Sequence, residues 1–492
     1  MEFLYWFIVL VYALLLGFIL LYSFTQLNLV LSYSKARKKN PAPMPRLEEL
    51  PKVTVQLPIF NELFVSERLI RNIVQLDYPK DLLQIQVLDD STDETKDLLH
   101  ELCKEYELAG FDIQHIHRVN RQGYKAGALA EAMPLVKGSF IAIFDADFLP
   151  KPDFLKRTLP WFVDENVGVV QTKWTHINED YNLLTDLQAF GLNAHFSVEQ
   201  SGRNQAGHFI NFNGTAGVWR KTTIENAGGW QSDTITEDLD LSYRAQLKGW
   251  KFIFREEVGS PSELPASMPS LKTQQYRWTK GAAECARKNL LKVWKTKGIS
   301  FSTKVHALFH LMNSFLFICI IITALLSVPL LFIKQSLGAD RDVFKFGGIF
   351  ALSLLILTLF YWISFRVHEG GGLRNILRFI WKFPAFLSVS MGLSLHNAIA
   401  VLEGYAGKKT AFVRTPKFNL QNRKDTWSRT KYISKTVNWL TVIEGVLTLY
   451  FIFGLGLGVY LGDFGLFFYH IMLSLGFGSV YFYSLKHRIQ FN

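Results

Sequence analysis

Apolar and polar positions divide the chain into regions of different pattern. Residues 3–31 are nearly all apolar, residues 53–172 alternate β-rich runs with amphipathic stretches, and long apolar stretches return after residue 301. A helix of about 20 apolar residues can span a bilayer. The pattern predicts an N-terminal transmembrane helix (residues 1–34), a basic, proline-rich linker (35–51), an α/β domain (52–298) and transmembrane and interfacial helices (299–492).

Within the α/β domain, the β-rich runs are residues 53–57, 85–88, 140–144 and 167–172, and residues 62–75 and 95–108 have helical periodicity. This alternation predicts parallel strands with helices on both faces of the sheet. Ligands of such sheets bind at the carboxyl ends of the strands. Two of these ends carry paired acids, Asp89 with Asp90 and Asp145 with Asp147.

The second half of the chain contains four apolar stretches that are each long enough to span a membrane: residues 311–333, 346–365, 440–461 and 466–485. A further stretch, 379–402, is interrupted by Pro384, His396 and Asn397. The segment 405–435 that follows it is strongly basic and contains a single acid, Asp425, so we expect it on the cytoplasmic side. We therefore predict five crossings in all, with 379–402 in the membrane plane or partly re-entrant, against an alternative of six.

Charge supports a membrane protein with its α/β domain in the cytoplasm. Lys35, Arg37, Lys38 and Lys39 follow the first apolar stretch, and this bias is typical of the cytoplasmic side. The net charge is +11, but the basic residues lie next to apolar spans, which indicates lipid headgroups and anionic ligands and no nucleic-acid partner. The three cysteines are scattered, so neither a disulfide framework nor a zinc site is expected.

Asp145 and Asp147 are candidate metal ligands because carboxylates are preferred by Mg²⁺ and Mn²⁺. The sequence has no glycine-rich phosphate loop, so a divalent cation would have to neutralise any phosphate group. An ordinary strand-end turn is the alternative.

The segment 234–250 offers a candidate general base. Thr236 can cap a helix whose first turn holds Glu237, Asp238 and Asp240, and capping alone would explain most of these residues. A carboxylate at this position could also remove a proton from an acceptor hydroxyl.

Other motifs suit a phosphorylated sugar, each with a plainer alternative. Lys125 at the start of a helix could bind a diphosphate, and Asn213 with Gly214 forms a tight segment that a sugar could approach. Residues 412–417, "FVRTPK", could form a mobile lid over a charged ligand or bind lipid headgroups. Gln274, Arg277 and Trp278 share one helix face, with two groups for a diphosphate and an indole for a pyranose ring.

The order of these motifs resembles that of processive family-2 glycosyltransferases, the inverting synthases of cellulose, chitin, hyaluronan and mannan. The order is "VLDD", "DAD", "TED", Gln274-x-x-Arg277-Trp278 and then a membrane region. The strings "YKAGAL", "HFSVEQ" and "QQYRW" are most similar to plant cellulose-synthase-like mannan and glucan synthases. The resemblance implies an α/β GT-A (Rossmann-like) glycosyltransferase domain joined to an α-helical transmembrane domain.

The resemblance also implies a role for each motif. Asp238 would act as the general base, with Thr236 and Glu237 around it. Asp145 and Asp147 would bind the metal. The acceptor would meet Trp278, Asn213 and Gly214, and the gating loop would consist of Phe412, Thr415 and Lys417. The remaining residues would bind the nucleotide sugar: Phe60, Glu62, Asp89 or Asp90, Lys125, Asp145, Gln274 and Arg277.

The expected function is a membrane-embedded hexosyltransferase that polymerises a β-linked glucan or mannan, with 1,4 linkages expected, and moves it across an inner, plasma or Golgi-type membrane. Its donor would be a nucleotide sugar such as UDP-glucose or GDP-mannose, its cofactor Mg²⁺ or Mn²⁺, and its other partners the growing polysaccharide and membrane lipids. Two rivals remain: a glycosyltransferase that adds one sugar to a ceramide- or polyprenyl-type lipid, and a non-catalytic carbohydrate channel or assembly subunit.

Overall fold

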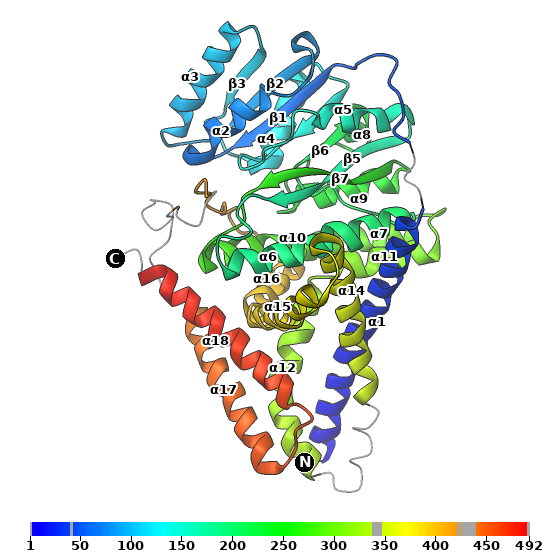
Figure 1. Cartoon of the computed structure of the whole chain (residues 1–492), viewed down its shortest axis with the longest axis vertical. Coiled ribbons are helices and arrows are strands. Elements are labelled where there is room, and N and C mark those ends of the chain that lie inside the picture. The colour runs from blue at the N-terminus through cyan, green and yellow to red at the C-terminus, as the bar shows by residue number, and fades with distance from the viewer. Residues whose placement is uncertain (1, 40–42, 337–346, 421–424, 426–438, 490–492) are drawn as a thin grey trace.

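The computed structural model describes residues 2–39, 43–336, 347–420, 425 and 439–489. A mixed β-sheet with its helices lies at one end of the molecule, and long helices extend from beneath it to the other end (Figure 1). The predicted loop 405–435 is therefore described only for residues 405–420 and for Asp425.

The sheet has seven strands in the order β3-β2-β1-β4-β6-β5-β7. β1, β2, β3 and β4 are mutually parallel where they pair, and β5 is parallel to β7. The expectation of parallel strands is wrong for β6, which pairs antiparallel with both β4 and β5. The strands are β1 (Val53–Ile59), β2 (Leu83–Asp89), β3 (Asp112–His117), β4 (Phe140–Ile143), β5 (Val167–His176), β6 (Gly217–Arg220) and β7 (Lys251–Ser262).

Helices cover both faces of the sheet, as predicted. Because side chains alternate along a strand, Ala142 of β4 joins one buried core, with α2 and α3, while Ile141 and Ile143 join the other, with α4 and α9. The helices of this region are α2 (Leu63–Ile73), α3 (Thr95–Leu108), α4 (Tyr124–Ala132), α5 (Phe154–Thr158), α6 (Leu183–Ala194), α7 (Gly202–Gln205), α8 (Lys221–Asn226) and α9 (Glu237–Leu247). A π-helical segment, His195–Ser201, joins α6 to α7.

α10 (Met268–Lys295) lies between the sheet and the membrane helices (Figure 1). Its start is fixed by Ser267, whose hydroxyl accepts a hydrogen bond from the Ser270 N–H, and Pro269 occupies its first turn. α10 packs against α9, α11 (Phe301–Leu311) and α16 (Ser394–Ala406). Residues of α10 therefore contact both the sheet region and the membrane helices.

Five long helices extend away from the sheet region: α1 (Glu2–Arg37), α12 (Phe315–Ser336), α14 (Ala351–Glu369), α17 (Trp439–Leu461) and α18 (Phe467–Ile489). Within the described residues, four helical segments are long and apolar enough to cross a membrane: α1, α12, residues 348–369 and α17. α18, predicted as the fifth crossing, packs along α17 but is less apolar and is not among them.

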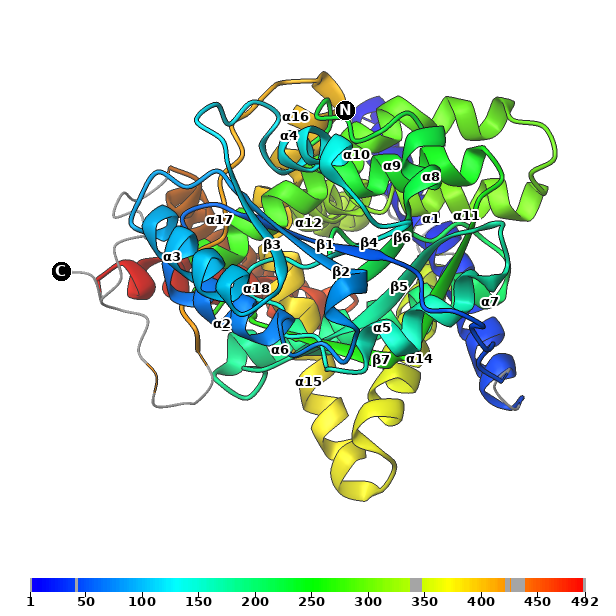
Figure 2. The same cartoon turned by 90° about the horizontal axis from the view of Figure 1, so that it is seen from above.

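The stretch 379–402 falls in two helices, α15 (Leu373–Gly392) and α16 (Ser394–Ala406), which meet at an angle of 50°. Such a bent pair is either a broken span or a re-entrant loop. Viewed from above, α15 extends sideways from the molecule, across the direction of the five long helices (Figure 2). The placement of residues 379–402 in the membrane plane stays a prediction, because the bent pair also allows a broken span.

Candidate active site

A cavity of about 210 Å³ lies where the carboxyl ends of β1, β2 and β4 face α10. It collects side chains from motifs that are more than 350 residues apart in the chain. The predicted site residues that line it are Phe60, Glu62, Asp90, Lys125, Asp145, Asp147, Asn213, Gly214, Thr236, Glu237, Asp238, Gln274, Arg277, Trp278, Phe412, Thr415 and Lys417.

Each carboxylate of the "DAD" motif is paired with a lysine. The Lys125 ammonium lies 2.5 Å from Asp145 Oδ1, and Lys417 Nζ lies 2.7 Å from Asp147 Oδ2. The Asp145 carboxylate also raises the pKa of Lys125, against the opposite effect of burial. The carboxylate oxygens of these two acidic side chains are the type of ligand that a hard divalent cation prefers.

Asp238 and Glu237 begin α9 as adjacent buried carboxyl groups. Burial, reinforced by the nearby Glu237 carboxylate, raises the pKa of Asp238 to about 7. The pKa of Glu237 is raised as well, mainly by burial. A carboxyl group with a pKa near neutrality is suited to accept a proton. Thr236 occupies the N-cap position, but its side chain makes no capping bond, so the predicted cap is wrong.

Gly214 allows the backbone to approach Asp238 closely. Its φ angle is +80°, and a Cβ atom at this position would lie 3.1 Å from Asp238 Oδ2. The Gly214 carbonyl also accepts a hydrogen bond of 2.8 Å from Lys125. The backbone at Gly214 therefore contacts both Asp238, the candidate general base, and Lys125, the candidate residue for binding a diphosphate.

On α10, Arg277 offers a cationic surface to the cavity and Trp278 offers an aromatic one. Arg277 Nη2 donates a hydrogen bond of 2.8 Å to Thr415 Oγ1, and its guanidinium lies 4.6 Å from the ring centre of Phe412. The Trp278 ring lies 6.3 Å from that of Trp174 on β5. Gln274 lines the cavity on the same face of the helix.

An aromatic and cationic stack closes the end of the cavity near β1. The Arg121 guanidinium lies 3.3 Å from the ring centre of Phe60, and it also contacts Tyr124 and Phe412. The sequence motif contained Arg121, but no role was predicted for it or for Tyr124. The sequence did contain a signal for this role. Arg118 and Arg121 are two cations that lie three positions apart, directly before a helix.

The two acids after β2 differ in position. Asp90 lines the cavity and forms a bidentate pair with Arg118, with Nε–Oδ1 and Nη2–Oδ2 distances of 2.7 and 2.6 Å. Asp89 is fully buried, and its Oδ2 atom lies 2.9 Å from His115 Nε2 and 3.0 Å from His117 Nδ1. The structure therefore brings Asp90 to the cavity and places Asp89 behind it.

Asp89, His115 and His117 also form a group that could ligate a metal. Their ligand atoms all lie within 4.8 Å of one another. Although burial opposes it, hydrogen bonds from His115 and Ser91 lower the pKa of Asp89. These bonds satisfy the carboxylate without an ion.

The order of acids, the GT-A-like sheet and the cavity agree with comparisons to known proteins. Residues 51–281 match the family described as "Glycosyltransferase like family 2". These residues form a family-2 glycosyltransferase domain. The domain contains the sheet, the "DAD" carboxylates, α9 and the first half of α10.

Relatives that match between 52% and 69% of this chain include glucomannan 4-beta-mannosyltransferases of plants. Glucomannan 4-beta-mannosyltransferase 1 of Oryza sativa subsp. japonica is 37% identical over 341 residues, or 64% of each chain. Glucomannan 4-beta-mannosyltransferase 2 of Arabidopsis thaliana is 37% identical over 64% of this chain and 62% of its own. Across eight such relatives, the matched part covers between 46% and 66% of the relative's length.

A solved structure has the same fold. It is the mannosyltransferase PcManGT from Pyrobaculum calidifontis in complex with GDP-Man and Mn²⁺. It superposes with a TM-score of 0.54 and 20% sequence identity over 81% of this chain and 100% of its own. The likeness shows the GT-A architecture of the family-2 domain.

Two features adjoin the family-2 domain from outside residues 51–281. Four residues of the segment 412–417 line the cavity, and Arg414 Nη1 lies 3.4 Å from Glu62 Oε1. A second cavity of about 220 Å³ lies among α6, α10, α12, α14, α15 and α16. Leu192, Gln274 and Trp278 line both cavities, so they form the boundary between the site of the family-2 domain and the membrane helices.

Proposed function

We propose that the chain is an inverting, processive β-hexosyltransferase that polymerises a β-linked glucan or mannan from a nucleotide sugar. The observation that carries the proposal is the shared wall between the two cavities. Trp278 and Gln274 face both the carboxylates of the family-2 domain and the space among the membrane helices. A product formed at Asp238 could then pass directly into the second cavity.

Asp145 and Asp147 would hold a Mg²⁺ or Mn²⁺ ion between the protein and the donor diphosphate. Their oxygen ligands fit such an ion, and the bound ion would supply charge neutralisation for the leaving diphosphate. Lys125 is held 2.5 Å from Asp145, where its ammonium would add a second positive charge. Arg277 would bind the same phosphates with its planar guanidinium.

The nucleobase of the donor would lie against the stack of aromatic and cationic side chains near β1. Phe60, Arg121 and Phe412 offer flat faces on which a nucleobase can stack, and Asp90 and Glu62 line the same end. Thr415 and Lys417 contact Arg277 and Asp147, so residues 412–417 would close over the bound nucleotide as a lid.

Asp238 would accept the proton of the acceptor hydroxyl as that oxygen attacks the anomeric carbon. The new glycosidic bond forms as the bond to the diphosphate breaks, and the configuration inverts. The raised pKa of Asp238 makes its carboxylate a stronger base than an exposed aspartate. Trp278 would stack on the terminal sugar of the acceptor, beside Asn213 and Gly214.

The catalytic cavity would face the cytoplasm, where nucleotide sugars are made. Lys35 and Arg37 in the last turn of α1 support this orientation. The helix α15 would lie at the bilayer surface, where its exposed Trp381 and Leu377 would meet lipid.

A donor screen with one matched variant tests the proposed chemistry. The purified chain in lipid nanodiscs, given Mn²⁺ or Mg²⁺, is expected to transfer sugar from UDP-glucose or GDP-mannose. Asp238→Asn should lower kcat on the order of 10²- to 10⁴-fold, while donor binding by calorimetry stays intact because no donor contact is removed. Transfer by Asp238→Asn at a rate near wild type would refute the assignment of the base.

A further inference from the structure

One face of α10 contains both residues that line the cavity and residues that pack against α9. Gln274, Arg277, Gly281, Glu284 and Lys288 recur at intervals of three or four, so they form a single stripe along the helix. The first half of the stripe lines the cavity. The second half packs against the start of α9, the helix that carries Asp238.

Close packing and hydrogen bonds join the entry of α9 to this stripe. The Ile235 N–H donates a hydrogen bond of 2.8 Å to Glu284 Oε2, and Thr236 Oγ1 lies 3.4 Å from Cys285 Sγ. A Cβ atom on Gly281 would lie 2.4 Å from Thr236 Cγ2. The backbone that leads into the candidate base is thus fixed relative to α10.

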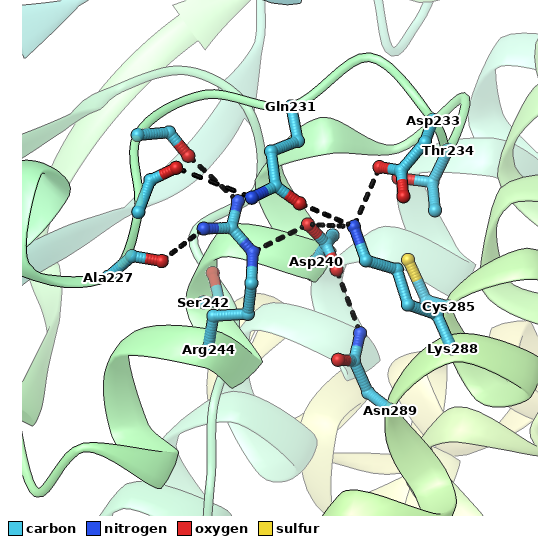
Figure 3. Close-up of polar contacts among 12 residues, drawn as sticks. Ala227, Gln231, Asp233, Thr234, Asp240, Ser242, Arg244, Cys285, Lys288 and Asn289 are labelled. Carbon is cyan, nitrogen blue, oxygen red and sulfur yellow. Dashed lines mark hydrogen bonds and ion pairs between the residues drawn. The ribbon is translucent and has the colours of Figure 1, made fainter.

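Asp240 is the buried centre of this contact (Figure 3). Its side chain is fully buried, and its oxygens accept hydrogen bonds from Arg244 Nε at 2.8 Å, Lys288 Nζ at 3.0 Å and Asn289 Nδ2 at 2.9 Å. Arg244 lies in α9 itself, whereas Lys288 and Asn289 come from α10. Although burial opposes it, these partners lower the pKa of Asp240, so its carboxylate stays charged.

Lys288 also extends the contact to the loop before α9. Its ammonium lies 2.6 Å from Asp233 Oδ1 and 2.8 Å from Gln231 Oε1. Asp233 is 58% exposed, in contrast to Asp240, so the two ion pairs of Lys288 can be separated by mutation.

We propose that Asp240, Lys288 and Asn289 are positioning residues that set the distance between the general base on α9 and the diphosphate-binding face of α10. The inference rests on the proposed function, because it assigns Asp238 to the acceptor and Arg277 to the donor. It identifies a contact outside the cavity on which the chemical step depends. Displacement of a reacting group by about 1 Å can lower a rate on the order of 100-fold.

The test uses three variants of the full chain in nanodiscs. Lys288→Met and Asn289→Leu each remove one contact between the helices and leave the Asp240–Arg244 pair in place. Asp233→Asn is the control, because it removes only the exposed partner of Lys288. Lys288→Arg retains the cation and tests for rescue.

The expected result is a loss in kcat without a loss in donor affinity. Lys288→Met and Asn289→Leu should lower kcat on the order of 10- to 100-fold, while the donor KM stays within about twofold since Arg277 and Lys125 are untouched. Asp233→Asn and Lys288→Arg should keep most of the activity. A kcat near wild type in both test variants, or a parallel loss of donor affinity, would overturn the proposal.

A second measurement, of cysteine labelling, does not depend on enzyme activity. It therefore tests the contact between α9 and α10 independently of the proposed function. Cys285 is fully buried between α9 and α10 and contacts Thr236. In a Cys103→Ala, Cys319→Ala background, labelling of Cys285 by a maleimide should accelerate in Lys288→Met and Asn289→Leu but not in Asp233→Asn. Equal labelling in all variants would refute the positioning role of these residues, whereas a wild-type chain that transfers no sugar would refute only the proposed function.

Discussion

At the residue scale, the two carboxyl groups that begin α9 share one environment. Burial raises the pKa of both Glu237 and Asp238, and the Glu237 carboxylate adds to the effect on Asp238. Lys125 acts in the opposite direction on both. The ionisation of Asp238 is therefore sensitive to the charge of its neighbour.

This coupling predicts a pH dependence. If Asp238 accepts a proton, kcat/KM should fall as the pH decreases through its pKa of about 7, because the protonated form cannot act as a base. Glu237→Gln removes a like charge and should move this acidic limb to lower pH. The measurement is kcat/KM from pH 5 to 9 for both proteins. An acidic limb at the same pH in Glu237→Gln would contradict this account of the site.

The sequence predicted most of the acids of the cavity, the α10 face and also Phe60 and Glu62, but not Arg121 or Trp174. Asp145, Asp238 and Arg277 stand in short motifs whose chemistry can be read locally. The role of Arg121 depends on Phe60 and Phe412, which lie far from it in the chain, so its position above the Phe60 ring could not be derived from local pattern. Trp174 was missed for the same reason, since its partner is Trp278 on α10.

At the scale of elements, the segment 412–417 joins the membrane region to the carboxylates. Lys417 Nζ lies 2.7 Å from Asp147 Oδ2, and Thr415 accepts a hydrogen bond from Arg277. An ammonium on Asp147 competes with a divalent cation for the same oxygen. Movement of the segment and occupation of the metal site should therefore be linked.

Lys417→Met should strengthen Mn²⁺ binding in the absence of donor. Loss of a charge-assisted pair frees the Asp147 carboxylate, so the Kd for Mn²⁺ should decrease by about tenfold or more. Titration followed by electron paramagnetic resonance measures free Mn²⁺ directly. Lys408→Met is the matched control, because it removes an exposed pair with Glu403 at the base of the same segment. Unchanged Mn²⁺ affinity in Lys417→Met would exclude the competition.

The hydrophobic pattern predicted the long elements and four of the strands, but not β3, β6 or β7. α3 has the predicted bounds, and β1, β2, β4 and β5 overlap the predicted runs. β6 has four residues and lies antiparallel to its neighbours, and β7, at the sheet edge, is interrupted in its middle by three charged residues, 255–257. Their pairing depends on contacts across the sheet, which local periodicity does not contain.

At the scale of the whole molecule, two cavities lie in series along α10. The first contains the carboxylates, and the second is lined by α6 and α10 on one side and by residues of the membrane helices on the other, among them Phe386, Ser390 and Asn397. Trp278 separates them. This arrangement fits a product that leaves the site through the membrane region.

Filling the second cavity should therefore shorten the product. Ser390→Trp places a large ring in the cavity, so chain extension should stop after a few sugars while the first transfers continue. The control is Leu377→Trp, on the same helix but 60% exposed. Gel electrophoresis of radiolabelled product would show short oligosaccharides for Ser390→Trp and wild-type lengths for Leu377→Trp. Full-length product from Ser390→Trp would place the exit elsewhere.

The length of the product made by the purified wild-type chain tests the central claim most directly. The measurement is the size distribution after incubation with labelled GDP-mannose or UDP-glucose and Mn²⁺, with Asp238→Asn in parallel. Polymerisation predicts a long β-linked product, sensitive to an endo-β-glycanase, that is absent from Asp238→Asn. A product enlarged by one sugar on a lipid would contradict polymerisation, and no sugar transfer from any donor would contradict catalysis itself.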